Sequence, residues 1–154
     1  MCEDSVNIVN STGLIGSILV SGAFADALDI DFSTVDISQV SIDNAGNDCL
    51  DVSFGNYKIG LINLLNCDDK GVSVGEGSTL SAKEMHLSGA NIGVSSKDLS
   101  KVEILNAKFK NVAVCIEVIQ KKQEFGGAAL QVGNLDCDGI IEVDKHSEFK
   151  AGLS

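Results

Sequence analysis

A repeat of 22 residues limits what this chain can fold into more than any other feature. Six segments follow one another at this spacing, and each opens with alternating apolar and polar residues. Their first residues are Asp4, Asp26, Asp48, Lys70, Ile92 and Val114. Alternation with a period of two is typical of a β-strand. A fixed period this short, without a helical pattern, indicates a solenoid in which each repeat is one coil.

Stacking the coils lines up their apolar residues. One column contains Val6, Leu28, Leu50, Val72, Val94 and Ile116. A second contains Ile8, Ile30, Val52, Val74, Ser96 and Val118. Later in each coil four more apolar residues recur at spacings of three, two and three, as in Ile15, Ile18, Val20 and Ala23. After an insertion at residues 121–127, the last coil continues with Leu130, Gly133 and Leu135. We expect these columns to point inward.

A sharp corner is predicted just before the last apolar residue of each coil. The residues at this position are Gly22, Asn44, Asn66, Gly89 and Asn111. Gly and Asn tolerate the left-handed backbone conformation that a tight corner needs. The repeat and its corners predict one all-β domain over residues 1–154, a parallel β-helix of about six to seven coils of 22 residues.

These coil lengths and Asn-bearing corners resemble the right-handed parallel β-helices of the pectate-lyase-like superfamily, across nearly the whole chain. Residues 67–78, 91–100 and 121–125 are similar to segments of β-helix proteins from bacterial surface-polysaccharide loci. The resemblance implies right-handed coils and a polysaccharide partner. Lyases and hydrolases of this superfamily usually bring an Arg to the substrate carboxylate, and this chain contains none. We therefore expect a glycan-binding module first and an enzyme second.

The charge of the chain narrows its partners further. The formal net charge is −11, and all eleven basic residues are Lys. Nucleic acid and anionic membrane surfaces are poor partners for such a protein, although Ca²⁺ could bridge its carboxylates to an acidic polysaccharide. No stretch approaches the roughly 20 apolar residues of a membrane span, and residues 1–4 do not resemble a signal peptide. We expect a cytoplasmic protein or a fragment of a surface-associated one.

The ends of the solenoid show no amphipathic helix or polar cap. Uncapped coils leave apolar residues and strand edges open to another chain. We therefore interpret the chain as a fragment of a longer protein or one segment of an assembly, with self-association through the uncapped ends.

Five cysteines are predicted to be free thiols. They are Cys2, Cys49, Cys67, Cys115 and Cys137. Cys49 and Cys115 share a column but lie three coils apart, at a strand spacing of about 4.8 Å. A disulfide needs Cα atoms within roughly 7 Å. No pair of Cys and His residues has the spacing of a metal site, and His86 and His146 are predicted to be isolated surface residues.

Outward residues of neighbouring coils form ladders, and one flank gathers charged residues from several coils. The predicted ligand-binding and catalytic residues of this flank are Asp29, Asp51, Glu76, Lys97, Asp98, Lys121 and Lys122. Four glycines are expected to leave a shallow groove beside Glu76 and Lys97; they are Gly71, Gly75, Gly77 and Gly93. Mixed carboxylates and amines beside a groove favour a sugar polymer as the ligand.

Three other functions remain open for the same flank. In a polysaccharide lyase or epimerase, Lys97 would remove a proton alpha to a carboxylate. Asp51, Glu76 and Asp98 would lie near a bound cation. In a glycoside hydrolase, two carboxyl groups about 5 to 9 Å apart would act together, as Asp29 and Asp51 could. In a structural spacer, the charges form only a solvated face.

Overall fold

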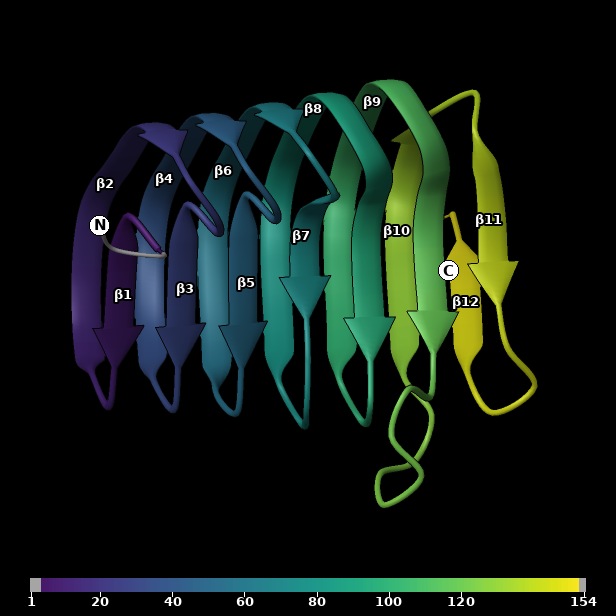
Figure 1. Ribbon diagram of the computed structural model, residues 1–154. Helices are drawn as coiled ribbons and strands as arrows, with labels where there is room; N and C mark the ends of the chain where they lie inside the picture. Colours follow the sequence, from purple (N-terminus) through teal and green to yellow (C-terminus); the bar gives the residue numbers. More distant parts are fainter. Residues whose placement is uncertain (1–3, 153–154) are drawn as a thin grey trace.

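The computed structural model describes residues 4–152 as a parallel β-solenoid of about seven turns, with no helix among them (Figure 1). This confirms the predicted all-β fold and its repeat of about 22 residues. Successive coils stack side by side from the N-terminal β1 to the C-terminal β11 and β12 (Figure 1). No described helix is long and apolar enough to cross a membrane.

Most coils consist of one short and one long strand joined by tight corners. The short strands are β1 (Val6–Val9), β3 (Leu28–Asp31), β5 (Leu50–Ser53) and β7 (Lys70–Val74). The long strands are β2 (Thr12–Ala23), β4 (Thr34–Ala45), β6 (Asn56–Cys67), β8 (Thr79–Lys97) and β9 (Lys101–Ile119). The chain continues through β10 (Ala129–Asp136), β11 (Ile140–Val143) and β12 (Glu148–Ala151). β8 and β9 run through the corner, so each pairs along both halves of a coil.

The predicted inward columns form the core. Leu28 pairs in register with Val6 on one side and Leu50 on the other, and the column continues through Val72, Val94 and Ile116. From Leu28 to Ile116 this column is fully buried, with 0% exposure at each residue. Removing such columns from water is the main stabilising term for a solenoid, at about 25 cal/mol per Å² of apolar surface.

The predicted corners are also confirmed. The five residues named for this position all have a positive φ: Gly22 (80°), Asn44 (64°), Asn66 (54°), Gly89 (87°) and Asn111 (55°). Each coil therefore bends at the same place for the same reason, because Gly and Asn adopt the left-handed conformation of this corner at little steric cost.

The last coil departs from the predicted alignment by two residues. Leu130 pairs with Val102, and Val132 takes the column of Ile104 that had been assigned to Leu130. The cause is the loop at residues 120–128 between β9 and β10, which extends beyond the insertion expected from the sequence. Leu135 pairs with Ala107, so Cys137 lies two residues further on, at the level of the inward-facing Phe109.

The prediction of free thiols is wrong for four of the five cysteines. Cys49 forms a disulfide with Cys67, and Cys115 forms one with Cys137, with Cα atoms 5.4 and 6.2 Å apart. The sequence comparison considered cysteines in the same column, which are three coils apart. The observed bridges instead join different positions of consecutive coils. Cys49 precedes β5 and Cys67 ends β6, while Cys115 lies within β9 and Cys137 follows β10. Cys2 lies outside the described residues.

Candidate functional site

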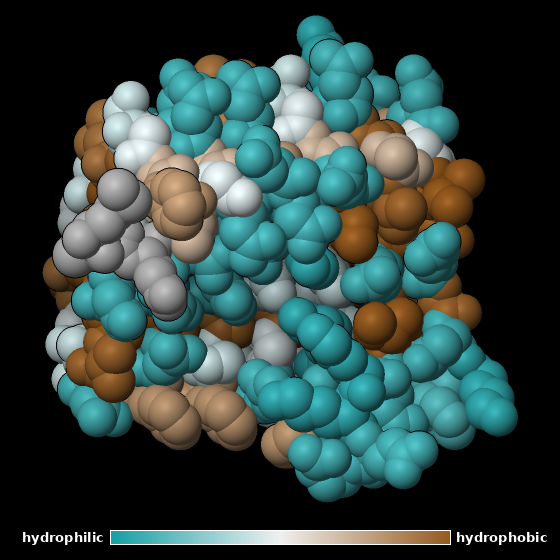
Figure 2. Space-filling view, in the orientation of Figure 1, coloured by the Kyte–Doolittle hydropathy of each residue, from teal (hydrophilic) through white to brown (hydrophobic). Residues whose placement is uncertain are grey.

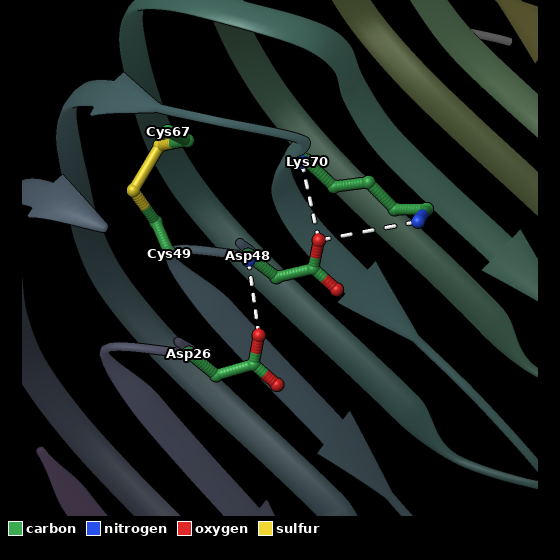
Figure 3. Close-up of a disulfide and its surroundings, with 5 residues drawn as sticks. All are labelled: Asp26, Asp48, Cys49, Cys67 and Lys70. Carbon is green, nitrogen blue, oxygen red and sulfur yellow. Dashed lines mark hydrogen bonds and ion pairs between the residues drawn. A yellow bond between two sulfur atoms is a disulfide. The ribbon is translucent and has the colours of Figure 1, made fainter. Parts of the chain in front are cut away.

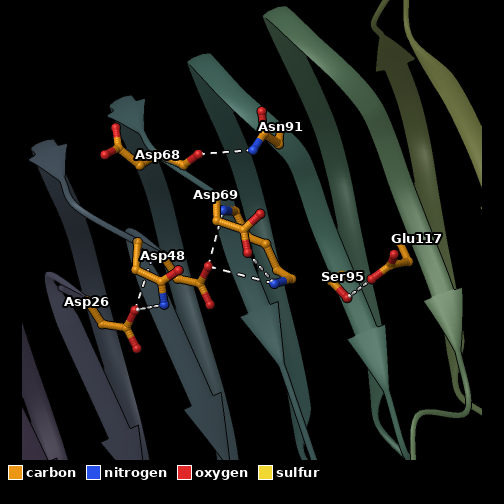
Figure 4. A network of polar contacts seen from close by, with 9 residues as sticks. Asp26, Asp48, Asp68, Asp69, Asn91, Ser95 and Glu117 are labelled. Atoms are coloured by element: carbon orange, nitrogen blue, oxygen red, sulfur yellow. Dashed lines mark hydrogen bonds and ion pairs between the residues drawn. The ribbon is translucent and has the colours of Figure 1, made fainter.

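The sheet of short strands presents an outward surface that we call the short-strand face. It consists of β1, β3, β5 and β7, the ends of β8 and β9 that pair with them, and β11. Hydrophilic residues cover the middle of this face in Figure 2. One column that alternates with the inward columns runs through its centre: Asp29, Asp51, Ser73, Ser95 and Glu117. Ser73 and Ser95 are buried, whereas the three acidic residues are partly exposed. Ser95 donates a hydrogen bond of 2.6 Å to Glu117, as Figure 4 shows.

Three carboxylates gather at the edge of this face. Asp26, Asp48 and Asp51 each place an oxygen atom within 4.8 Å of the others. The backbone orders two of them, because Asp26 accepts a hydrogen bond of 3.0 Å from the Asp48 N–H and Asp48 accepts one of 3.1 Å from the Lys70 N–H (Figure 3). The same contact therefore repeats from one coil to the next. Carboxylate oxygens in such a group are ligands that a hard cation such as Ca²⁺ accepts.

Lys70 is the cation closest to these carboxylates among the ion pairs of the described residues. Its Nζ lies 2.6 Å from Asp69 and 3.9 Å from Asp48 (Figure 3 shows the second contact). Burial acts to lower the pKa of Lys70, but the hydrogen bond from Lys70 to Asp69 and the charge of Asp48 raise that pKa above its usual value. Lys70 therefore remains protonated at neutral pH.

Three carboxyl groups of this face have raised pKa values. Burial, followed by the charge of Asp48, raises the pKa of Asp51 to about 7. Burial also raises the pKa of Asp48 to about 6, although Lys70 opposes the rise. The pKa of Asp29 rises to about 6 through burial and the nearby charge of Asp31. A group of carboxyls with pKa values near neutrality can exchange protons under physiological conditions.

The predicted flank is divided between this face and the adjoining corner. Asp29 and Asp51 lie on the short-strand face, and the charge of Lys97 acts on Asp51 there. At the corner, Lys122 forms an ion pair of 2.6 Å with Glu76. Their predicted roles in catalysis and binding stay predictions.

Asp98 supports the loop that follows β9. Its side chain is buried and accepts hydrogen bonds from the N–H groups of Lys121 (2.7 Å) and Lys122 (2.9 Å). Those contacts fix the start of the loop that carries Lys122 towards Glu76. In this role Asp98 is a structural anchor, with little of its carboxylate left to face a ligand.

Two of the four glycines expected to form a groove point into the core instead. A Cβ on Gly71 would lie 2.7 Å from the Leu87 side chain, and one on Gly93 would lie 2.7 Å from the Phe109 ring. These glycines make room for large core residues, not for a ligand. Gly75 is buried, whereas Gly77 is exposed with open space around its Cβ position.

An aromatic corner, formed by Phe32, Phe54 and Phe125, adjoins Glu76. The rings of Phe32 and Phe54 are parallel to within 2°, with centroids 4.9 Å apart. Phe125, from the loop at residues 120–128, meets Phe54 edge-on at 6.5 Å. Phe54 and Glu76 belong to successive coils, and the Phe54 N–H donates a hydrogen bond of 3.1 Å to the Glu76 backbone oxygen.

The backbone holds these rings outward at a cost. Phe32 and Phe54 have φ values of 50° and 46°, in the left-handed region that bulky side chains rarely adopt. The two residues are nevertheless 56% and 42% exposed. Asn10 and Asp98, at the same position of other coils, are left-handed as well, both with φ of 52°. The conformation is therefore a second recurring corner of the solenoid, and at Phe32 and Phe54 it presents the rings to solvent.

Some of these residues carried a signal in the sequence that was missed. Asp26, Asp48 and Lys70 are the first residues of three successive repeats, so their stacking follows from the period. Each was treated as a boundary of a strand and not as a member of a ladder. The position of Phe125 carried no such signal, because it lies in the insertion that interrupts the repeat.

No family model, curated protein or solved structure matches this chain. The resemblance to the pectate-lyase-like superfamily and to polysaccharide loci therefore stays a prediction. The parallel β-solenoid itself rests on the strand register.

Proposed function

We propose that this protein is a glycan-binding module whose ligand lies along the aromatic corner and the neighbouring short-strand face. The observation that carries the proposal is the exposed, parallel pair of Phe32 and Phe54 beside the ion pair of Glu76 and Lys122. A sugar ring has an apolar face of C–H groups and a polar rim. The exposed apolar surface of the two stacked rings fits the first, and a carboxylate with an ammonium group fits the second.

The repeat suits a polymer better than a single sugar. Phe32, Phe54 and Glu76 follow one another along the solenoid axis, one coil apart. A chain that runs along this axis meets a new side chain at each coil, so weak contacts add up. The glycan that the sequence resemblance implies is a bacterial surface polysaccharide.

The disulfides also support this proposal. Bridges such as Cys49–Cys67 and Cys115–Cys137 form and persist mainly in oxidising compartments outside the cytoplasm. Surface polysaccharides occur in the same compartments. The disulfides therefore favour the surface-associated alternative over a cytoplasmic protein.

The test is a glycan array with the purified chain, followed by titration calorimetry on the best ligand, with Ca²⁺ and with a chelator. Phe32→Ala combined with Phe54→Ala should weaken binding at least about tenfold, which corresponds to about 1.4 kcal/mol. Glu76→Ala and Lys97→Ala test the charged part of the flank.

Phe24→Ala is the matched control, because Phe24 is 75% exposed and belongs to a different corner of the coil. Equal loss in Phe24→Ala and in the double variant would contradict the proposed site. An absence of binding under all conditions would contradict the glycan-binding function and favour the structural spacer.

A polysaccharide lyase or epimerase is a second candidate, favoured by one observation. The pKa of Asp51 rises to about 7 next to Lys97, so this carboxyl could exchange protons with a substrate at neutral pH. Elimination from a uronate polymer creates a conjugated double bond that absorbs ultraviolet light. Absorbance that grows with wild-type protein and is absent with Asp51→Asn would support lyase activity, and no growth with any uronate polymer would exclude a lyase. Epimerisation forms no double bond, so its test is uptake of deuterium from heavy water into the uronate polymer.

A further inference from the structure

The first described coil offers a strand edge without the usual protection. Among residues 4–152, β1 pairs only with β3 and β2 only with β4. Residues 4–25 include a single charged residue, Asp4, and no Lys or Pro. On β2, Leu14 is 85% exposed and Leu19 is 74% exposed. Natural sheets guard such edges with charges, Pro or a covering segment, because an open edge pairs readily with another strand.

The other end of the solenoid exposes the continuation of the core. β11 pairs with β9, where Ile141 and Val143 extend the inward columns of Ile116 and Val118. Both residues are nevertheless exposed, by 45% and 41%. Figure 2 shows apolar residues gathered at this end of the molecule. The solenoid therefore has an apolar surface at each end, and the edge strands at both ends run in the same direction.

The two ends match when their columns are followed through the molecule. The column of Ile141 is the column that begins at Val6, and the column of Val143 begins at Ile8. A second copy translated along the axis would therefore place β1 beside β11, with Val6 next to Ile141 and Ile8 next to Val143. The apolar columns would continue without a break.

Side chains of β12 in one copy are complementary in size to those of β2 in the next copy. Phe149 ends a column that begins at Gly13 and otherwise holds Val35, Tyr57, Leu80, Val102 and Leu130. Open space surrounds the Cβ position of Gly13, so the large ring of Phe149 would face the one member without a side chain. Lys150 ends the column that begins at Leu14 and continues to Asp36. Its hydrocarbon stem would cover Leu14 while its ammonium group points towards Asp36.

Strand direction selects the orientation of this contact. A copy translated along the axis keeps β1 parallel to β11, as neighbouring strands are within the solenoid, and continues the same columns. Two N-terminal ends could meet only if one copy were turned over. That would set their strands antiparallel and would not continue the columns from one copy into the next.

We propose that copies of this chain stack head to tail, with β1 and β2 of one copy pairing in parallel with β11 and β12 of the next. Such a contact is heterologous and does not close, so it produces a filament that grows by one solenoid at a time. The aromatic corners of successive copies would then line up along one side.

The test uses the full chain and places like charges across the predicted register. In the stack Thr12 lies opposite Glu148, and Leu14 lies opposite Lys150. Thr12→Glu combined with Leu14→Lys creates two repulsive pairs from exposed residues. Sedimentation velocity over a range of concentrations should show oligomers for the wild type and at least tenfold weaker association for this variant, because about 1.4 kcal/mol is tenfold.

Charge reversal then tests the register itself. Adding Glu148→Lys and Lys150→Glu to the weakened variant turns both repulsive pairs into attractive ones and should restore association. Asn63→Glu with Leu65→Lys is the matched control, because it places the same charges at the same spacing on exposed positions of β6 and should leave association unchanged. Circular dichroism and thermal melting confirm that each variant is folded.

Three results would overturn the proposal. The first is a wild type that stays monomeric at the highest concentration. The second is a failure of the four-fold variant to recover association, which would show another register or orientation. The third is an equal loss in the control on β6, which would indicate a general effect of the new charges.

Discussion

Replacing Asp51 by Asn should stabilise the protein at alkaline pH and have little effect in acid. Burial and the charge of Asp48 raise the pKa of Asp51 from 3.8 to about 7. The folded protein therefore holds a proton at Asp51 that the unfolded chain has already released between these two pH values. The free energy of unfolding falls as the pH rises through that window.

The magnitude follows from the size of the shift. A rise from 3.8 to about 7 corresponds to on the order of 4 kcal/mol, because one pKa unit is worth 1.36 kcal/mol. Solvent that still reaches the group reduces this figure, so we expect Asp51→Asn to gain about 2 to 4 kcal/mol at about pH 8. At about pH 4 Asp51 is protonated in the folded protein, and the gain should be close to zero.

Urea unfolding at several pH values measures this difference, with a chelator present so that no cation occupies the carboxylates. Asp36→Asn is the matched control, since Asp36 is an exposed Asp on β4 and its substitution should change stability by less than about 0.5 kcal/mol. A gain from Asp51→Asn that is the same at pH 4 and pH 8, or a loss of stability at pH 8, would refute the reasoning.

Three further predictions test the fold. Thiol titration of the protein unfolded without reductant should find one free thiol among the five cysteines. Reduction should lower the unfolding free energy by roughly 3 kcal/mol per bridge. Five titratable thiols would contradict the disulfides. Tyr57→Phe should cost about 1 kcal/mol in a thermal melt, because the buried hydroxyl donates a hydrogen bond of 2.7 Å to the Ser53 backbone oxygen; an unchanged melt would show that this bond adds no net stability. Gly46→Ala should lower the free energy of unfolding in urea by about 1 to 3 kcal/mol, since the new Cβ would lie 1.9 Å from the Phe24 backbone oxygen. Gly16→Ala, with open space around its Cβ position, should lower it much less. Equal losses would contradict this packing.

The fold could be predicted because every coil repeats the same pattern of apolar residues and corner residues. A single coil is ambiguous, but Leu28, Leu50 and Val72 at one spacing leave only one arrangement that buries them all. The corners followed from Asn44, Asn66 and their equivalents because backbone sterics alone favour Gly and Asn there. The prediction failed after the loop before β10, because this loop interrupts the repeat. The register predicted for the last coil was therefore wrong.

The candidate site could be predicted only in part, because its key features break the repeat. The pairing of Cys49 with Cys67 joins a corner to a strand end, a relation that columns do not reveal. Nothing in the side chains of Phe32 and Phe54 predicts a left-handed backbone. Phe125 reaches them through an irregular loop, whose path is set by tertiary contacts such as the anchor at Asp98.

The two disulfides also decide how this molecule can come apart. A solenoid loses structure most easily by peeling one coil at a time from an end, since each coil contacts only its neighbours. Cys49–Cys67 and Cys115–Cys137 tie consecutive coils together at two places within the stack. Unfolding that starts at either end therefore reaches a disulfide, which holds two coils together, before it reaches the middle of the solenoid. The coils that carry Glu76 and Lys97 lie between the two disulfides. A protease that cuts unfolded ends would therefore leave the central part of the binding flank intact.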